Sequence, residues 1–112
     1  MKFKELFMTD KGFPCNIDGI VFDNNPRYKS RKPLHGVGIN DFKFAIGRST
    51  GSKIVHWFPY HIWKHMITRG HSVYFKASHP YYLNVEVCSE WHSFTSFWEW
   101  LSDQNYVDGV EL

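Results

Sequence analysis

Large apolar side chains recur at helical spacing in two runs of the second half of the chain. This pattern limits the fold more than any other feature of the sequence. Members of the first run are Tyr60, Ile62, Trp63, Met66 and Ile67, and members of the second run are Phe94, Phe97, Trp98 and Leu101. Side chains three and four positions apart share one face of an α-helix, so the sequence predicts two amphipathic helices.

The ends of both helices have sequence signals. Pro59 suits the first turn of a helix, and Gly70 is typical of the residue that ends one. The second helix is predicted to end near Asn105. Its N-terminal cap is expected to be Ser93 or Thr95, whose side-chain oxygens can accept hydrogen bonds from the first turn.

Alternating and β-branched residues predict the strands. Residues 42–46 alternate between large apolar and smaller or charged side chains, residues 47–52 (GRSTGS) read as a turn, and residues 53–58 (KIVHWF) read as a second strand. We therefore predict a hairpin over residues 42–58. A further short strand or extended segment is predicted over residues 85–91.

The first third of the sequence is less regular. Residues 3–8 fit either a strand or a helix. Residues 17–22 predict a strand interrupted by Gly19, unless Asp18 and Gly19 form the turn of a tight hairpin. Residues 23–33 combine prolines, serine and four basic side chains without periodicity, which is typical of a loop.

Together these elements predict one α+β domain over residues 1–112, with a β-hairpin or small antiparallel sheet packed against two amphipathic helices. Within it we distinguish an N-terminal strand region with a basic loop (residues 1–35) from residues 36–106. A chain of this length forms a modest core. Since 19% of the residues are aromatic, we expect a few large rings to fill most of it.

Several sequence features bear on location. No apolar run approaches the roughly 18 residues that a membrane span requires. The first ten residues contain acids and lack the apolar stretch of a signal peptide. Cys15 and Cys88 form no CxxC pair and are compatible with a reducing compartment. We therefore expect a cytoplasmic protein.

Charge is unevenly distributed although the net charge is only +2. Residues 24–84 hold ten basic side chains and one acid, Asp41, whereas residues 85–112 hold six acids and no Lys or Arg. Such a basic segment predicts a surface for nucleic acid. The predicted contact residues are Arg27, Lys29, Arg31, Lys32, Lys43, Arg48, Lys53, Lys64, Arg69 and Lys76. The alternative is that the basic segment folds against the acidic tail and neutralises it.

Motifs for catalysis are weak. His61 and His65 have the spacing of two metal ligands on a helix, but Ile62 stands where a zincin has its glutamate. Cys88 lies in an alternating segment, where a free cysteine is usually buried and inert. GRSTGSK lacks the spacing of a phosphate-binding loop. We therefore predict no catalytic residue and no cofactor.

Three segments carry a family resemblance. GVGIND (residues 36–41), PYHIWKHMITR (residues 59–69) and HPYYLNVEVCSEWHSFTSFWEW (residues 79–100) resemble the HNH-type homing endonucleases of phages in residue type, order and approximate spacing. The resemblance covers residues 36–106. It implies a phage protein, located in the host-cell cytoplasm, that shares the DNA-associated part of these enzymes.

The sequence departs from that family at its end. Members continue from the third segment into an Asp-rich stretch and a nuclease module with further His and Asn residues. Here Asp108 resembles the first of those acids, but Val110 stands where a second is expected, and the sequence ends at Leu112. The resemblance therefore implies DNA binding without cleavage.

Three functional hypotheses result. The first is a non-catalytic protein that binds nucleic acid, with double-stranded DNA as the expected partner. The second is an accessory protein that inhibits a host or defence protein, using Glu99, Asp103 or Trp100. The third is a metal-dependent endonuclease with Mg²⁺ or Zn²⁺, using His65 and His79 in a dimer. The oligomeric state is not predicted.

Overall fold

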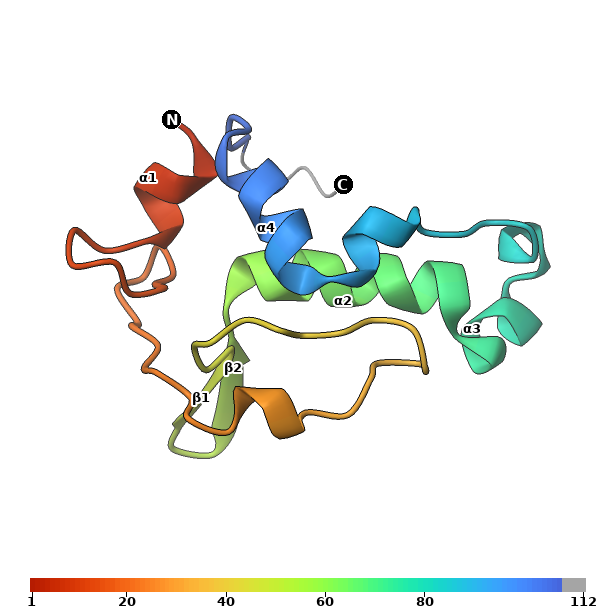
Figure 1. Cartoon of the computed structure of the whole chain (residues 1–112), viewed down its shortest axis with the longest axis horizontal. Coiled ribbons are helices and arrows are strands. Elements are labelled where there is room, and N and C mark those ends of the chain that lie inside the picture. Colours follow the sequence, from red (N-terminus) through yellow and green to blue (C-terminus); the bar gives the residue numbers. More distant parts are fainter. Residues whose placement is uncertain (108–112) are drawn as a thin grey trace.

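A computed structural model describes residues 1–107 of the chain. Figure 1 shows α2 running through the middle of the molecule, with α4 crossing it and a β-hairpin near its N-terminal end. Regular elements in chain order are α1 (Phe3–Phe7), the 3₁₀ turn η1 (Tyr28–Ser30), β1 (Gly47–Thr50), β2 (Lys53–His56), α2 (Phe58–His71), α3 (Val73–Ser78), the 3₁₀ turns η2 (Pro80–Tyr82) and η3 (Ser89–His92), and α4 (Phe94–Ser102). The predicted role of Asp108 and Val110 lies outside the described residues.

Helix α2 buries the predicted aromatic face. Trp63 and Ile67 have no exposed surface, and the indole Nε1 of Trp63 donates to the carbonyl oxygen of Trp91 at 2.8 Å. Just before the helix, Trp57 is also fully buried and stacks on Phe42, with ring centroids 5.0 Å apart. A buried indole needs a partner for its N–H, and both have one. The core is therefore built from a few large rings, as predicted.

Helix α4 follows the prediction at its start and ends earlier, at Ser102 rather than near Asn105. Its buried face is the predicted set Phe94, Phe97, Trp98 and Leu101. Ser93 is the cap, because its hydroxyl accepts a hydrogen bond from the backbone N–H of Ser96 at 3.2 Å. Satisfying such an end group stabilises a helix by about 1 kcal/mol.

The hairpin exists, but its first strand is not where the sequence predicted it. β1 occupies residues 47–50, within the predicted turn, and pairs antiparallel with β2 so that Thr50 lies opposite Lys53. The reversal is the two residues 51–52, and Gly51 has a φ of 78°, which glycine adopts without strain. The predicted strand over 42–46 makes one isolated bridge, between Asn24 and Phe44. Its alternation reflects burial against the core, not a long ladder.

The N-terminal segment is wound through short turns. Residues 3–8, left open by the sequence, form helix α1. The strand predicted over 17–22 is wrong and the tight-turn alternative is correct, since Cys15 and Val21 form an antiparallel bridge around Gly19. The residue before α1 pairs with the segment after α4, where Lys2 and Asn105 form an antiparallel bridge.

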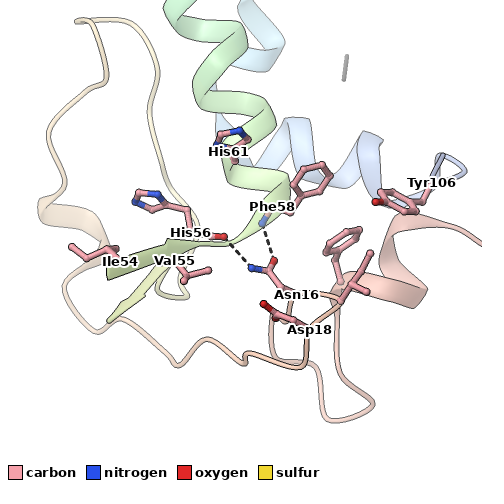
Figure 2. A pocket seen from close by; sticks show the side chains of 10 residues that line it. Asn16, Asp18, Ile54, Val55, His56, Phe58, His61 and Tyr106 are labelled. Atoms are coloured by element: carbon pink, nitrogen blue, oxygen red, sulfur yellow. Dashed lines mark hydrogen bonds between the residues drawn. The ribbon is translucent and has the colours of Figure 1, made fainter. Parts of the chain in front are cut away.

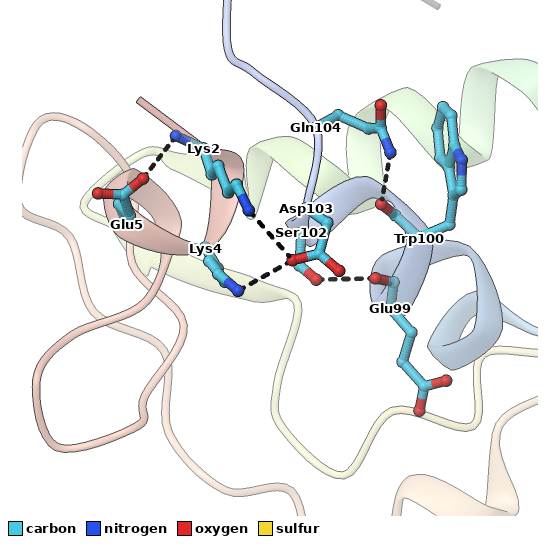
Figure 3. Close-up of polar contacts among 8 residues, drawn as sticks. All are labelled: Lys2, Lys4, Glu5, Glu99, Trp100, Ser102, Asp103 and Gln104. Atoms are coloured by element: carbon cyan, nitrogen blue, oxygen red, sulfur yellow. Dashed lines mark hydrogen bonds and ion pairs between the residues drawn. The ribbon is translucent and has the colours of Figure 1, made fainter.

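Lysines of the N-terminal segment hold the acid at the end of α4. Lys4 Nζ lies 2.9 Å from Asp103 Oδ1, and Lys2 Nζ lies 3.9 Å from the same oxygen (Figure 3). The hydrogen bond and the opposite charge raise the pKa of Lys4 and lower the pKa of Asp103. Both ion pairs described within residues 1–107 thus join the N-terminus, not the basic central segment, to the acidic end.

Residues 72–88, which we call the arm, extend from the C-terminal end of α2 (Figure 1). Gly70 does not end α2 as predicted. It is buried inside the helix, where an added Cβ would lie 2.9 Å from Val87 Cγ2. The strand predicted over 85–91 is absent: residues 85–88 have no regular secondary structure and η3 follows. Cys88 is exposed, contrary to the expectation of a buried thiol.

The structure confirms the α+β class: a small domain with a two-stranded antiparallel sheet and helices packed around an aromatic core. None of the helices in residues 1–107 has the length and apolar character needed to cross a membrane.

Candidate nucleic-acid interface

The basic loop lies along the segment that leads into the hairpin. Asn25 N–H donates to the carbonyl oxygen of Lys43 at 2.9 Å, and Ala45 N–H donates to that of Asp23 at 2.7 Å. Further along, Arg48 Nη1 donates to the carbonyl oxygen of Val21 at 3.0 Å. These bonds bring the loop with η1 next to the first hairpin strand (Figure 1).

Six of the predicted contact residues are exposed on the loop, on the segment that leads into the hairpin, and on the hairpin strands β1 and β2. We call them the hairpin–loop cations; they are Arg27, Lys29, Lys32, Lys43, Arg48 and Lys53. None of them makes an ion pair with a carboxylate of residues 1–107. Lys29 Nζ lies 5.9 Å from the ring centre of Tyr28, and Lys43 Nζ lies 5.4 Å from that of Phe44. Unpaired exposed cations beside aromatic rings are what a phosphate backbone contacts.

Arg31 differs from its neighbours because its guanidinium points inward. Nη1 donates to the carbonyl oxygens of Asn40 and Phe42, and Nη2 donates to that of Phe44 at 2.7 Å. Burial lowers the pKa of Arg31, partly offset by the negative charge of Asp41. Arg31 therefore fixes the backbone beneath the loop instead of standing free on its surface.

Lys64 extends the basic surface onto α2. It is half-buried and close enough to His56 on β2 to affect its ionisation. Burial first, and then the charges of Lys64 and His61, lower the pKa of His56. The lowered pKa favours the neutral imidazole of His56, while the nearby lysine supplies a positive charge.

Arg69 lies near the C-terminal end of α2, and Lys76 lies in α3, which belongs to the arm. Lys76 Nζ donates to the carbonyl oxygens of Leu83 and Val85 at 3.2 and 2.9 Å. Arg69 lines a cavity of about 420 Å³ beneath the arm, together with Glu86. The structure therefore brings six of the ten predicted residues together, places Lys64 beside them, and separates Arg31, Arg69 and Lys76 from them.

The candidate metal ligands form a pair. The rings of His61 and His65 lie one turn apart on α2, with centroids 4.2 Å apart. Over residues 1–107, no three His, Cys, Asp or Glu side chains are arranged to hold a metal ion. His79 lies on the arm, where its ring stacks on Phe75 and its Nδ1 is 3.1 Å from the Phe75 carbonyl oxygen.

A cavity of about 680 Å³ opens beside β2, at the start of α2 (Figure 2). Its wall includes Phe58, Tyr106 and the exposed Ile54, with His56 on the hairpin side. Asn16 fixes this wall: its amide donates to the His56 carbonyl oxygen at 3.0 Å and accepts from the Phe58 N–H at 2.9 Å. Sequence reasoning missed this cavity because its residues come from four separate segments without a shared motif.

The segments that carry the family resemblance meet in space. Ile39 N–H donates to the His92 carbonyl oxygen at 2.7 Å, and Phe94 N–H donates to the Ile39 carbonyl oxygen at 2.9 Å. Asp41 then accepts hydrogen bonds from the Ser93 hydroxyl at 2.6 Å and the Thr95 N–H at 2.9 Å. Burial alone would raise the pKa of Asp41, but these hydrogen bonds lower it. The matched residues thus join α4 to the centre of the domain.

Comparison with models of known families, with curated proteins and with solved structures finds no match for this chain. The resemblance to HNH-type homing endonucleases therefore stays a prediction from the three motifs.

Proposed function

We propose that the chain is a small non-catalytic protein that binds nucleic acid, with double-stranded DNA as the partner and the hairpin–loop cations as the contact surface. The observation that carries the proposal is that six exposed Lys and Arg side chains lie on the basic loop and the adjacent hairpin region, and none of them makes an ion pair with a carboxylate of residues 1–107. The phage origin and the relation to homing endonucleases belong to this proposal, because they rest on the motifs alone.

Electrostatics favours this surface over the rest of the molecule. Within residues 1–107 the hairpin–loop cations make no ion pair with the acidic end, where Asp103 pairs with Lys2 and Lys4. A two-stranded hairpin is narrow enough to enter the major groove of DNA, and Arg48 and Lys53 flank its turn. A loop beside it that bears Lys29 supplies further contacts to the phosphate backbone.

The test is the salt dependence of binding to a short DNA duplex. Counterion release predicts that log Kd rises with log salt, with a slope of about 0.9 for each phosphate contacted. Replacing Lys29 and Lys53 together by alanine should weaken binding and reduce that slope by about 2. Lys11→Ala, at an exposed lysine in the turn after α1, is the matched control and should leave the slope unchanged.

An affinity that does not vary with salt would refute the proposal. So would equal losses in the double variant and in Lys11→Ala, because binding would then follow overall charge and not this surface.

A second candidate function, inhibition of a host or defence protein, is favoured by the exposed face of α4. A groove of about 490 Å³ there is lined by Trp91, Trp100, Glu90 and Glu99. The two indole rings pack with centroids 4.7 Å apart, and Trp100 is 37% exposed. Tryptophans ringed by carboxylates suit a protein partner with basic side chains.

The two candidates make opposite predictions for matched variants. If this groove is the working surface, Glu99→Lys should abolish capture of one stoichiometric protein from nuclease-treated host lysate. The Lys29, Lys53 double variant should retain that capture. Retention by Glu99→Lys would refute the second candidate.

A further inference from the structure

Arg31 contributes a positive charge to a small cavity that has Lys32, one of the hairpin–loop cations, in its wall. The cavity has a volume of about 310 Å³ and is lined by Arg31, Lys32, Asn40, Tyr60 and Trp63, with Leu34, Gly38 and Ile46 completing the wall. One water molecule takes up roughly 30 Å³ in the liquid, so a hydrated or directly bound small anion fits. The cavity lies between the basic loop and α2, which both contribute residues to its wall.

The charge of Arg31 lacks an anionic partner. Its three described hydrogen bonds go to neutral carbonyl oxygens, and it makes no ion pair within residues 1–107. Asp41 lies within electrostatic reach, but its two carboxylate oxygens accept from Ser93 and Thr95. A guanidinium has five N–H donors, so two remain for a ligand after the three carbonyls are bound.

Burial without an anion disfavours the charged form of Arg31, and this lowers its pKa. An anion in the cavity would compensate that cost, and the same contact would form charge-assisted hydrogen bonds, which are stronger than neutral ones. Lys32, which is exposed at the rim, adds a second positive charge. Burial raises the pKa of Tyr60, against the opposing effect of Arg31, and this favours the protonated hydroxyl, which can donate to an anion.

We propose that this cavity is a binding site for a phosphate oxyanion, held by Arg31 and Lys32 with the Tyr60 hydroxyl. The proposal deepens the proposed function, on which it rests for the identity of the ligand. In a nucleic-acid complex the oxyanion is a backbone phosphate, and Arg31 is preorganised to receive it because three carbonyl oxygens already fix its orientation. A free phosphate has the same chemistry.

The experiment follows the Nε–H resonance of Arg31 by ¹H–¹⁵N NMR in the full chain. The probes are inorganic phosphate, added at constant ionic strength against chloride, and a short DNA duplex. Phosphate should shift the resonance with a saturating curve.

Lys32→Ala should weaken the apparent affinity roughly threefold, and Tyr60→Phe should weaken it as well. Both variants leave the carbonyl contacts of Arg31 in place, so folding is preserved. Lys11→Ala, at an exposed lysine outside the hairpin–loop cations, is the control and should not change the affinity.

The outcomes separate the site from the function. A shift with both probes supports the site as one for a backbone phosphate. A shift with phosphate alone supports a site for free phosphate, and if the duplex also fails to bind, the proposed function is refuted while the site stands. Duplex binding without any shift of Arg31 overturns the site and leaves the proposed function intact. A phosphate affinity that Lys11→Ala lowers as much as Lys32→Ala also overturns the site.

Discussion

The two ends of α2 are held in place by different forces. At its N-terminal half, Trp57 and Trp63 are fully buried among the rings of Phe42 and Phe94. At its C-terminal end the arm has few buried side chains, and Tyr74 in α3 is 88% exposed. Burial of apolar area stabilises the first end, whereas the second depends on individual polar contacts.

Val87 connects the arm to the rest of the domain through two backbone hydrogen bonds. Its backbone N–H donates to His71 Nε2 at 3.2 Å, and its carbonyl oxygen lies 2.9 Å from His92 Nε2. Lys76 holds the preceding residues through two carbonyl oxygens. A segment with few buried apolar contacts opens at lower free-energy cost than a core. We therefore expect the arm to open locally at a lower free-energy cost than the aromatic core.

The largest effect is expected for Trp63→Ala. The substitution empties a fully buried site and leaves the Trp91 carbonyl oxygen without its donor. Large-to-small changes of this kind lower the free energy of unfolding by about 3–5 kcal/mol. Urea denaturation followed by far-UV circular dichroism measures the loss. Trp100→Ala is the control, and its partly exposed indole should cost about 1 kcal/mol or less. Similar losses in both variants would contradict the account of the core.

A smaller effect, confined to the arm, is expected for Gly70→Ala. The new Cβ would lie 2.9 Å from Val87 Cγ2 and 3.2 Å from Val87 N, so the arm must shift. Overpacking costs about 1–3 kcal/mol, against which alanine returns up to about 1 kcal/mol of helix propensity. Hydrogen exchange should accelerate in residues 73–88 and stay unchanged at Trp57 and Trp63.

Gly38→Ala is the matched substitution on the core side. Its Cβ would lie 3.0 Å from Trp63 Cη2 and 3.1 Å from Ile67 Cγ2, both in the buried face of α2. Exchange should therefore accelerate throughout the core in this variant. If both glycine variants change exchange in the same residues, core and arm are one cooperative unit.

The core was predictable from the sequence and the hairpin register was not. Large rings at helical spacing mark Trp63 and Phe97 as buried whatever the tertiary context. β1, in contrast, consists of Gly47–Thr50, whose side chains are mostly exposed, so no apolar alternation marks it. Its position is set by pairing with β2, a contact between segments that single-residue patterns do not encode.

The candidate site was predictable in composition only. The motif RYKSRK identifies a basic loop but does not distinguish Arg27, which is exposed, from Arg31, which points inward. That difference depends on where the carbonyl oxygens of Asn40, Phe42 and Phe44 converge. Likewise, Gly70 reads as a helix end until the close approach of Val87 is known.

The smallest effect concerns the pH dependence of the arm. His71 must be neutral at Nε2 to accept from Val87, and protonation would remove this acceptor. Burial first, and then electrostatic effects of His92 and Lys76, lower the pKa of His71, against the opposing charge of Glu86. A lowered pKa in the folded state stabilises the arm fully above the unfolded value of about 6.5, and this contribution is lost as pH falls through the folded value.

Acidification should therefore raise the exchange rate of the Val87 amide, normalised to its intrinsic rate, more than that of core amides. Lowering the pH from about 7.5 to about 5.5 covers the range in which histidine titrates. His71→Gln should remove the dependence, because the titrating acceptor is gone. His61→Gln, at the core end of α2, should retain it. A Val87 amide whose normalised exchange does not respond to pH would show that Lys76 and the packing of Val87 on Gly70 hold the arm without the imidazole.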